Sequence, residues 1–126
     1  MSKVERTIVA IPGVLFLLTG LQWIFDPAAA AEALGLPLLD GLARSTEIGD
    51  LGAFFLACSG MILYGAATAK PHWLRAPAIL VGSAAFVRTL AWILHGADFA
   101  AAFIAVEVVV AGILFTVAGR LPATSS

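Results

Sequence analysis

The stretch Thr7–Phe25, TIVAIPGVLFLLTGLQWIF, carries no charged side chain over 19 consecutive positions. At about 1.5 Å of rise per residue, a helix of this length covers roughly 28 Å, close to the hydrocarbon thickness of a bilayer. An uncharged run of this length is typical of a membrane-spanning helix. We therefore expect this segment to cross a lipid bilayer.

Three further stretches have the same apolar character, although Arg88 interrupts one and Glu107 another. Lipid offers no hydrogen-bond partners to the backbone, and a strand-like alternation is absent, so each stretch is expected to be helical. The sequence predicts an all-α fold, an integral membrane four-helix bundle, as a single domain over residues 1–126. The expected spans are about 7–25, 47–69, 76–95 and 99–119, and a surface helix is expected over about 27–34.

The composition excludes several classes of protein. Hydrophobic residues make up 61% of the chain and charged residues only 12%, whereas soluble domains are about half apolar and a quarter charged. The formal charge of -1, without a basic cluster, argues against nucleic acid as a partner. Motifs of the GxGxxG, P-loop or HExxH type do not occur, so we expect no cofactor and no metal.

The basic residues outside the spans predict the orientation. Five of them fall on one expected side of the membrane and one, Arg44, on the other, which indicates that both termini are cytoplasmic. A signal peptide ending near Ala28 is the alternative, but the apolar run exceeds the roughly 7–15 residues typical of such a segment. The five are Lys3, Arg6, Lys70, Arg75 and Arg120.

Two charged residues fall within the expected spans at similar depth. Arg88 lies about 9 Å and Glu107 about 12 Å from the outer ends of consecutive helices. A charge near mid-bilayer costs from about 2.5 to over 10 kcal/mol, so such residues are normally paired and face the bundle interior. We expect Arg88 to be buried and paired with a carboxylate, Glu107 first and Asp50 next.

Other polar residues gather at the same expected outer side. Glu47 and Asp50 share a helix face, and Asp98 is expected to cap the last helix. We expect these acids and Glu107 to surround Arg88, so that one acid keeps a proton and acid/base chemistry becomes feasible. The candidate catalytic residues are Glu107, Asp50, Glu47 and Arg88, and the candidate ligand-binding residues are His95, Asp98, Gln22, Trp23 and Trp92.

Plainer interpretations exist for each candidate. Arg88 and its acid could simply clamp the helices together. Trp23 and Trp92 could belong to the aromatic belt at the membrane interface, which is the commoner role of such residues. His95 could ligate a metal with a nearby acid, although a histidine at a helix end is more often interfacial or a cap.

The chain resembles a known group of proteins. The segment EIGDLGAFFLACSG at 47–60 precedes Phe86-Val-Arg88, and Gly20 and Pro27 flank the end of the first helix. In this pattern the chain resembles the small four-helix bacterial membrane proteins of the DoxX-like group. The resemblance implies a four-helix bundle in a bacterial inner membrane with Glu47, Asp50 and Arg88 at the family's polar positions. Some members are associated with quinone-linked oxidoreductases, but a redox motif is absent here.

Three functions compete. The first is a pocket in the outer leaflet that binds a small amphipathic molecule, such as a terpenoid, quinone or lipid, with acid/base chemistry such as isomerisation, cyclisation or epoxide opening. The second is a non-catalytic accessory or assembly subunit of a larger membrane complex, which many small residues would suit. The third is a proton-coupled carrier. Whether the chain is an enzyme or forms a homo-oligomer is left open by the sequence.

Overall fold

The computed structural model describes residues 1–123, and these residues form helices and connecting segments without a strand. The helices are α1 (Lys3–Phe25), α2 (Pro27–Ala33), α3 (Gly41–Thr68), α4 (His72–His95) and α5 (Ala101–Gly119). Within this described part, four of them, α1, α3, α4 and α5, are long and apolar enough to cross a membrane. The predicted all-α fold with four membrane-length helices is confirmed.

Helix α1 begins at Lys3, four residues before the apolar run that starts at Thr7. The Ser2 hydroxyl accepts a hydrogen bond from the Glu5 N–H at 3.1 Å, and the Glu5 carboxylate accepts one from the Ser2 N–H at 3.1 Å. This reciprocal cap pairs two backbone donors that a helix start otherwise leaves free. The first turn of α1 is therefore polar and lies ahead of the expected boundary at Thr7.

Helix α2 begins where the chain leaves α1. Asp26 is its N-cap, with the carboxylate accepting from the Ala29 N–H at 3.4 Å. Pro27 occupies the first turn, where the N–H that proline lacks would be unpaired anyway. The short helix folds back so that Ala30 and Ala31 cover the ring of Trp23.

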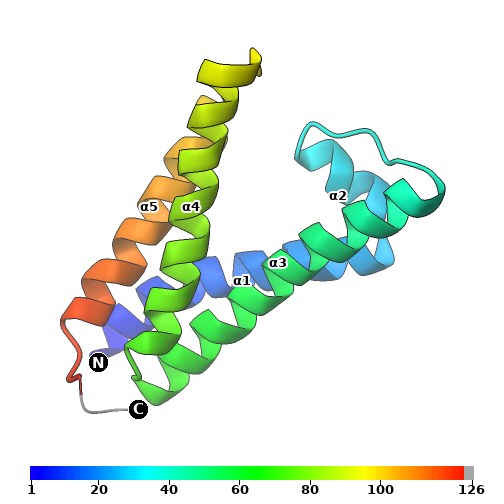
Figure 1. Ribbon diagram of the computed structural model, residues 1–126. Helices are drawn as coiled ribbons and strands as arrows, with labels where there is room; N and C mark the ends of the chain where they lie inside the picture. The colour runs from blue at the N-terminus through cyan, green and yellow to red at the C-terminus, as the bar shows by residue number, and fades with distance from the viewer. Residues whose placement is uncertain (124–126) are drawn as a thin grey trace.

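The long helices form two pairs. α1 packs along α3, and α4 packs along α5. Figure 1 shows that the pairs meet at the end of the molecule that carries both chain termini and diverge toward the opposite end. We call these the termini end and the loop end, the latter carrying the segments 34–40 and 96–100.

Small residues permit the close approach of helices at several points. A Cβ added to Gly20 of α1 would lie 2.6 Å from Cγ of Leu56 on α3. A Cβ on Gly65 of α3 would lie 2.7 Å from Cδ2 of Leu74 on α4. Both distances are too short for real atoms, so a larger residue at either position would force the facing leucine or the helix to shift.

The termini end is filled by apolar side chains from all four long helices. Polar contacts add to this packing, since Arg120 lies 3.4 Å from the Glu5 carboxylate and Arg6 donates to the Ala67 carbonyl at 3.1 Å. This end of the bundle is therefore closed. The buried cluster comprises Val9, Cys58, Ile62, Ala66, Leu74, Ala78, Val81, Val110, Leu114, Val117, Ala118 and Leu121.

Candidate functional site

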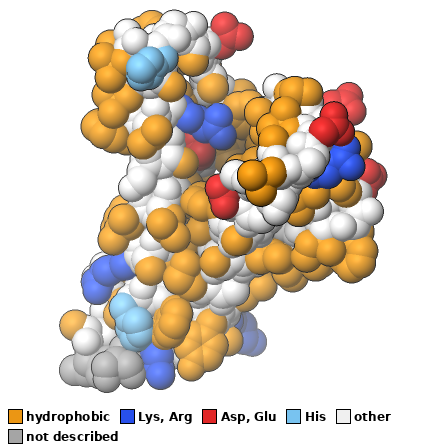
Figure 2. Space-filling view, turned by 45° about the vertical axis from the view of Figure 1, so that its right-hand side comes forward, with side chains coloured by type: hydrophobic (Ala, Val, Ile, Leu, Met, Phe, Trp, Pro, Cys, Tyr) orange, Lys and Arg blue, Asp and Glu red, His pale blue; other side chains and the backbone are white. Residues whose placement is uncertain are grey.

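A cavity of about 470 Å³ lies between the two helix pairs, on the side where they diverge. Figure 2 shows the hollow, with basic and acidic side chains beside otherwise apolar walls. Every long helix and α2 contribute to its lining. The lining residues are Leu15, Phe16, Thr19, Gln22, Ala30, Ala33, Leu34, Leu51, Phe54, Phe55, Val81, Ala84, Arg88, Phe103, Val106 and Glu107.

An ion pair between α4 and α5 forms part of the cavity wall. The Nε atom of Arg88 lies 3.0 Å from Oε1 of Glu107 and donates a hydrogen bond to Oε2 at 3.2 Å. The predicted pairing of Arg88 with Glu107 is confirmed. The expected burial of Arg88 is found only in part. Its side chain is 36% exposed, whereas that of Glu107 is 14% exposed. The exposure arises because the helix pairs diverge and leave the guanidinium beside the cavity.

An aromatic ring supports the same guanidinium. Cζ of Arg88 lies 4.8 Å from the ring centroid of Phe103, a distance at which the ring attracts a cation. Phe103 and Glu107 are four residues apart on α5, so they lie one turn apart on the same helix face. Arg88 is thus held by two side chains of one helix, a carboxylate and an aromatic ring.

Helical spacing explains how these residues reach the cavity. On α4, Val81, Ala84 and Arg88 are separated by three and four residues and line one face. On α5, Phe103 and Glu107 do the same. The small side chain of Ala84 leaves open space one turn below Arg88, where a larger residue would close the cavity.

The opposite wall carries two polar residues of α1. The Thr19 hydroxyl donates to the Leu15 carbonyl of its own helix at 3.0 Å, so it is already engaged. Gln22 was expected near the site from the sequence, and it does line the cavity. The side-chain amide of Gln22 makes no hydrogen bond within residues 1–123. This amide is therefore available to a ligand.

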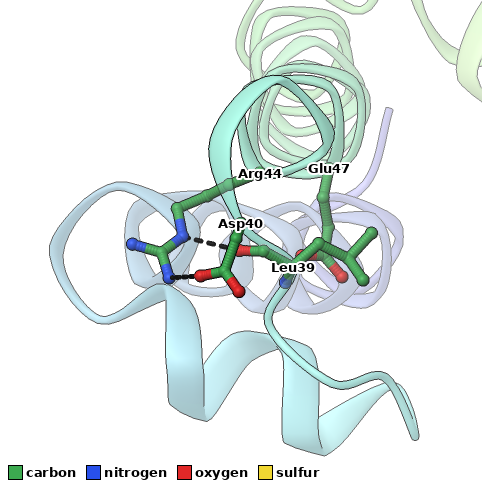
Figure 3. A network of polar contacts seen from close by, with 4 residues as sticks. All are labelled: Leu39, Asp40, Arg44 and Glu47. Carbon is green, nitrogen blue, oxygen red and sulfur yellow. Dashed lines mark hydrogen bonds and ion pairs between the residues drawn. The ribbon is translucent and has the colours of Figure 1, made fainter.

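Glu47 lies elsewhere and serves the loop before α3. Its carboxylate accepts a hydrogen bond from the Leu39 N–H at 2.9 Å, and only 7% of the residue is exposed. Arg44 donates to the Leu39 carbonyl at 2.6 Å and pairs with Asp40 at 2.9 Å (Figure 3). Side chains from the first turns of α3 thus hold the segment that leads into this helix.

The expected cluster of acids around Arg88 is wrong. Asp50 is exposed and lines, with Glu47, a separate shallow groove along the start of α3. Asp98 is exposed and does not cap α5, whose N-cap is Ala100. His95 is exposed in the last turn of α4. The cause is the divergence of the helix pairs, which carries the start of α3 away from α4 (Figure 1).

The tryptophans also differ from expectation. Trp23 is 0% exposed and packs against α2, so it belongs neither to an interfacial belt nor to the cavity lining. The small residues of α2 allow this helix to lie over the ring. Trp92 is exposed and makes an edge contact with Phe99, with ring centroids 4.9 Å apart, away from the cavity.

Several cavity residues were not singled out in the sequence. Phe103 is the clearest case, and its spacing of four residues from Glu107 could have revealed it. Phe16, Phe54 and Phe55 form the apolar wall, with Phe55 making edge contacts to both others at 5.4 and 5.3 Å between ring centroids. Their role could not be read from the sequence because phenylalanines also face lipid elsewhere in this chain.

Metal binding finds no support in the described residues, since residues 1–123 contain no group of three His, Cys, Asp or Glu side chains placed to hold an ion. Comparisons with protein-family models, curated proteins and solved structures found no match for this chain. The resemblance to the DoxX-like group therefore stays a prediction.

Proposed function

We propose that this protein binds a small amphipathic, lipid-like molecule in the cavity between its helix pairs. The observation that carries the proposal is an apolar cavity with one ion pair, Arg88 with Glu107, in its wall. Its volume of about 470 Å³ lies within the roughly 300–1,000 Å³ range of small-molecule sites. Apolar walls with a few polar groups are also the usual composition of such sites.

The alternative of a purely accessory subunit has less support. A chain that serves only as a packing partner needs no internal space, and its polar pair could be enclosed completely. Here the cavity reaches Glu107, and Arg88 remains partly exposed to it. The position of the cavity therefore favours ligand binding over a merely structural clamp.

A proton-coupled carrier is also less well supported. Such a protein needs a polar path through the membrane, and the termini end is filled by the apolar cluster around Ile62, Leu74 and Leu114. The acid/base chemistry expected from the sequence relied on a second acid close to Glu107. Glu47 and Asp50 line a different groove, so the proposal is confined to binding.

Lipid profiling of the purified protein tests the proposal. The protein is extracted from its native membrane in copolymer nanodiscs, and the co-purifying lipids are identified by mass spectrometry. Wild type should enrich a particular amphiphile that Ala84→Leu, which narrows the cavity one turn below Arg88, retains much less. Ala105→Leu, at an exposed position of α5 outside the cavity, is the matched control and should retain it. Identical lipid profiles for wild type and Ala84→Leu would contradict the proposal.

We further propose that the chain lies in a bacterial inner membrane with the termini end in the cytoplasm, which places the cavity toward the outer leaflet. The imbalance of basic residues supports this orientation. A membrane-impermeant maleimide applied to intact cells should label Asp40→Cys but label Arg75→Cys only after permeabilisation, both in a Cys58→Ala background. Equal labelling of both positions in intact cells would refute the orientation.

A further inference from the structure

The guanidinium of Arg88 keeps donor groups that its own ion pair does not use. Nε is the atom that meets Glu107, and the hydrogen bonds of residues 1–123 leave both Nη atoms without an acceptor. Phe103 lies against the same guanidinium and supplies no acceptor oxygen. Because Arg88 lines the cavity, these free donors are open to a bound molecule that carries an acceptor atom.

The Glu107 carboxylate has the complementary property. An ionised carboxylate offers about four lone-pair sites. Only one hydrogen bond reaches this carboxylate from the described residues, the one from Arg88 to Oε2. The other oxygen, Oε1, is enclosed, lies beside Arg88 Nε and has no hydrogen-bond partner among the described residues, so the carboxylate keeps acceptor sites for a molecule in the cavity.

The charges in the cavity lining disfavour a head group with a net charge. Arg88 and Glu107 are the charged residues of the lining, and their formal charges cancel. An anionic ligand would place a second negative charge beside Glu107, and a cationic ligand would place a second positive charge beside Arg88. Unbalanced charge is costly in apolar surroundings, so a neutral head group is preferred.

We infer that the ligand is a neutral amphiphile whose polar end is a hydroxyl group. A hydroxyl both donates and accepts, so it can accept from an Nη atom of Arg88 and donate to the carboxylate of Glu107. Its apolar tail lies against Phe16, Phe54 and Phe55. An ether or ester, which only accepts, leaves the carboxylate unused. This inference rests on the proposed function and specifies its class of ligand.

A competition experiment in lipid nanodiscs tests the head-group preference. The probe is a dodecanol analogue with a photoreactive diazirine in its tail, and its cross-links are mapped to peptides by mass spectrometry. Dodecanol, dodecyl methyl ether, dodecanoate and dodecylammonium serve as competitors, and Ala84→Leu supplies the background from the bilayer. We expect dodecanol to compete about tenfold better than each of the others, which corresponds to about one hydrogen bond.

Charge-altering variants sharpen the test. Glu107→Gln leaves Arg88 without a counter-charge, so dodecanoate should become the best competitor. Arg88→Gln leaves Glu107 uncompensated, so dodecylammonium should become the best. Glu5→Gln is the matched control, because Glu5 is paired with Arg120 and similarly enclosed, at 17% exposed, but lies at the termini end. Its glutamine can still accept in the helix cap, and the preference for dodecanol should persist.

The outcomes separate the inference from the proposed function. Cavity labelling that all four competitors suppress equally, or that dodecanoate suppresses best in wild type, overturns the hydroxyl inference but leaves ligand binding standing. Absence of cross-links from the cavity peptides overturns both. The wild-type preference decides the inference by itself if either charge-altering variant fails to fold.

Discussion

The termini end and the loop end of this bundle are built from the same four long helices and each contains an ion pair, but the cavity lies at the loop end. At the termini end, small residues and aliphatic side chains of α1, α3, α4 and α5 fill the interior, and the ion pair of Glu5 with Arg120 lies at its edge. At the loop end, the same helices diverge, and the ion pair of Arg88 with Glu107 lies in the wall of a cavity. An ion pair at a bundle edge ties chain ends together, whereas one in an apolar wall creates a site for a polar group.

The largest effect is expected from breaking the pair at the loop end. Arg88→Met leaves the Glu107 carboxylate without a counter-charge and should lower the free energy of unfolding by about 2–3 kcal/mol. This is below the roughly 3–5 kcal/mol known for fully buried pairs, because Arg88 is 36% exposed. Unfolding in detergent, followed by circular dichroism, measures the change.

The double variant Arg88→Met/Glu107→Leu provides the control for this prediction. Removing both charges takes away the uncompensated carboxylate, so much of the lost stability should return. Arg120→Met, which breaks the pair at the termini end, should cost less than about 1 kcal/mol, because Arg120 is 69% exposed and the Ser2 N–H still donates a hydrogen bond to the Glu5 carboxylate. A double variant that is no more stable than Arg88→Met would show that the isolated charge is not the cause.

A second comparison uses two alanines of α4, one in the filled core and one in the cavity lining. Ala78 is 0% exposed in the filled core, so Ala78→Leu should destabilise the fold by about 1–3 kcal/mol through overpacking. Ala84 lines the cavity, so the new side chain of Ala84→Leu enters empty space and should change stability by less than about 0.5 kcal/mol. Midpoints of thermal unfolding distinguish the two. Equal losses in both variants would mean that the cavity is not open in the membrane.

A smaller effect than that of breaking the ion pair is expected at the loop before α3. Glu47→Gln keeps an acceptor for the Leu39 N–H but removes the charge, so the loss should be about 0.5–1 kcal/mol or less. Retention of the co-purifying amphiphile should match wild type, because Glu47 does not line the cavity. Mass spectrometry of the bound lipids checks this. Loss of the amphiphile in Glu47→Gln would assign this acid to the binding site after all.

Much of the site could be anticipated because helical geometry is local. Arg88 and Glu107 interrupt apolar helices at similar depth, and a charge in that setting needs a partner, so their pairing followed from the sequence. Gln22 was likewise expected near the site from its place at the end of α1. Depth along a helix is a count of residues, and it does not depend on how the helices are arranged.

The positions of Glu47, Asp50 and Trp23 could not be obtained in this way. Each was expected on the same outer side of the membrane as the site, but this does not specify the direction in which a helix face turns or how far two helices diverge. The loop at 34–40 binds Glu47, and α2 covers Trp23, and both contacts join residues from different elements. Residues on the same expected side of the membrane therefore do not all belong to the same site.

The sequence alone determined that this protein is helical, that four of the helices in residues 1–123 are of membrane length, and that Arg88 needs an acid. These properties depend on the composition of continuous segments and on the cost of exposing charge or backbone to lipid. The tertiary structure alone decided that the helix pairs meet at one end and diverge at the other, which creates the cavity. That divergence depends on side chains that meet between helices, such as Gly65 against Leu74, and such contacts join residues of separate elements.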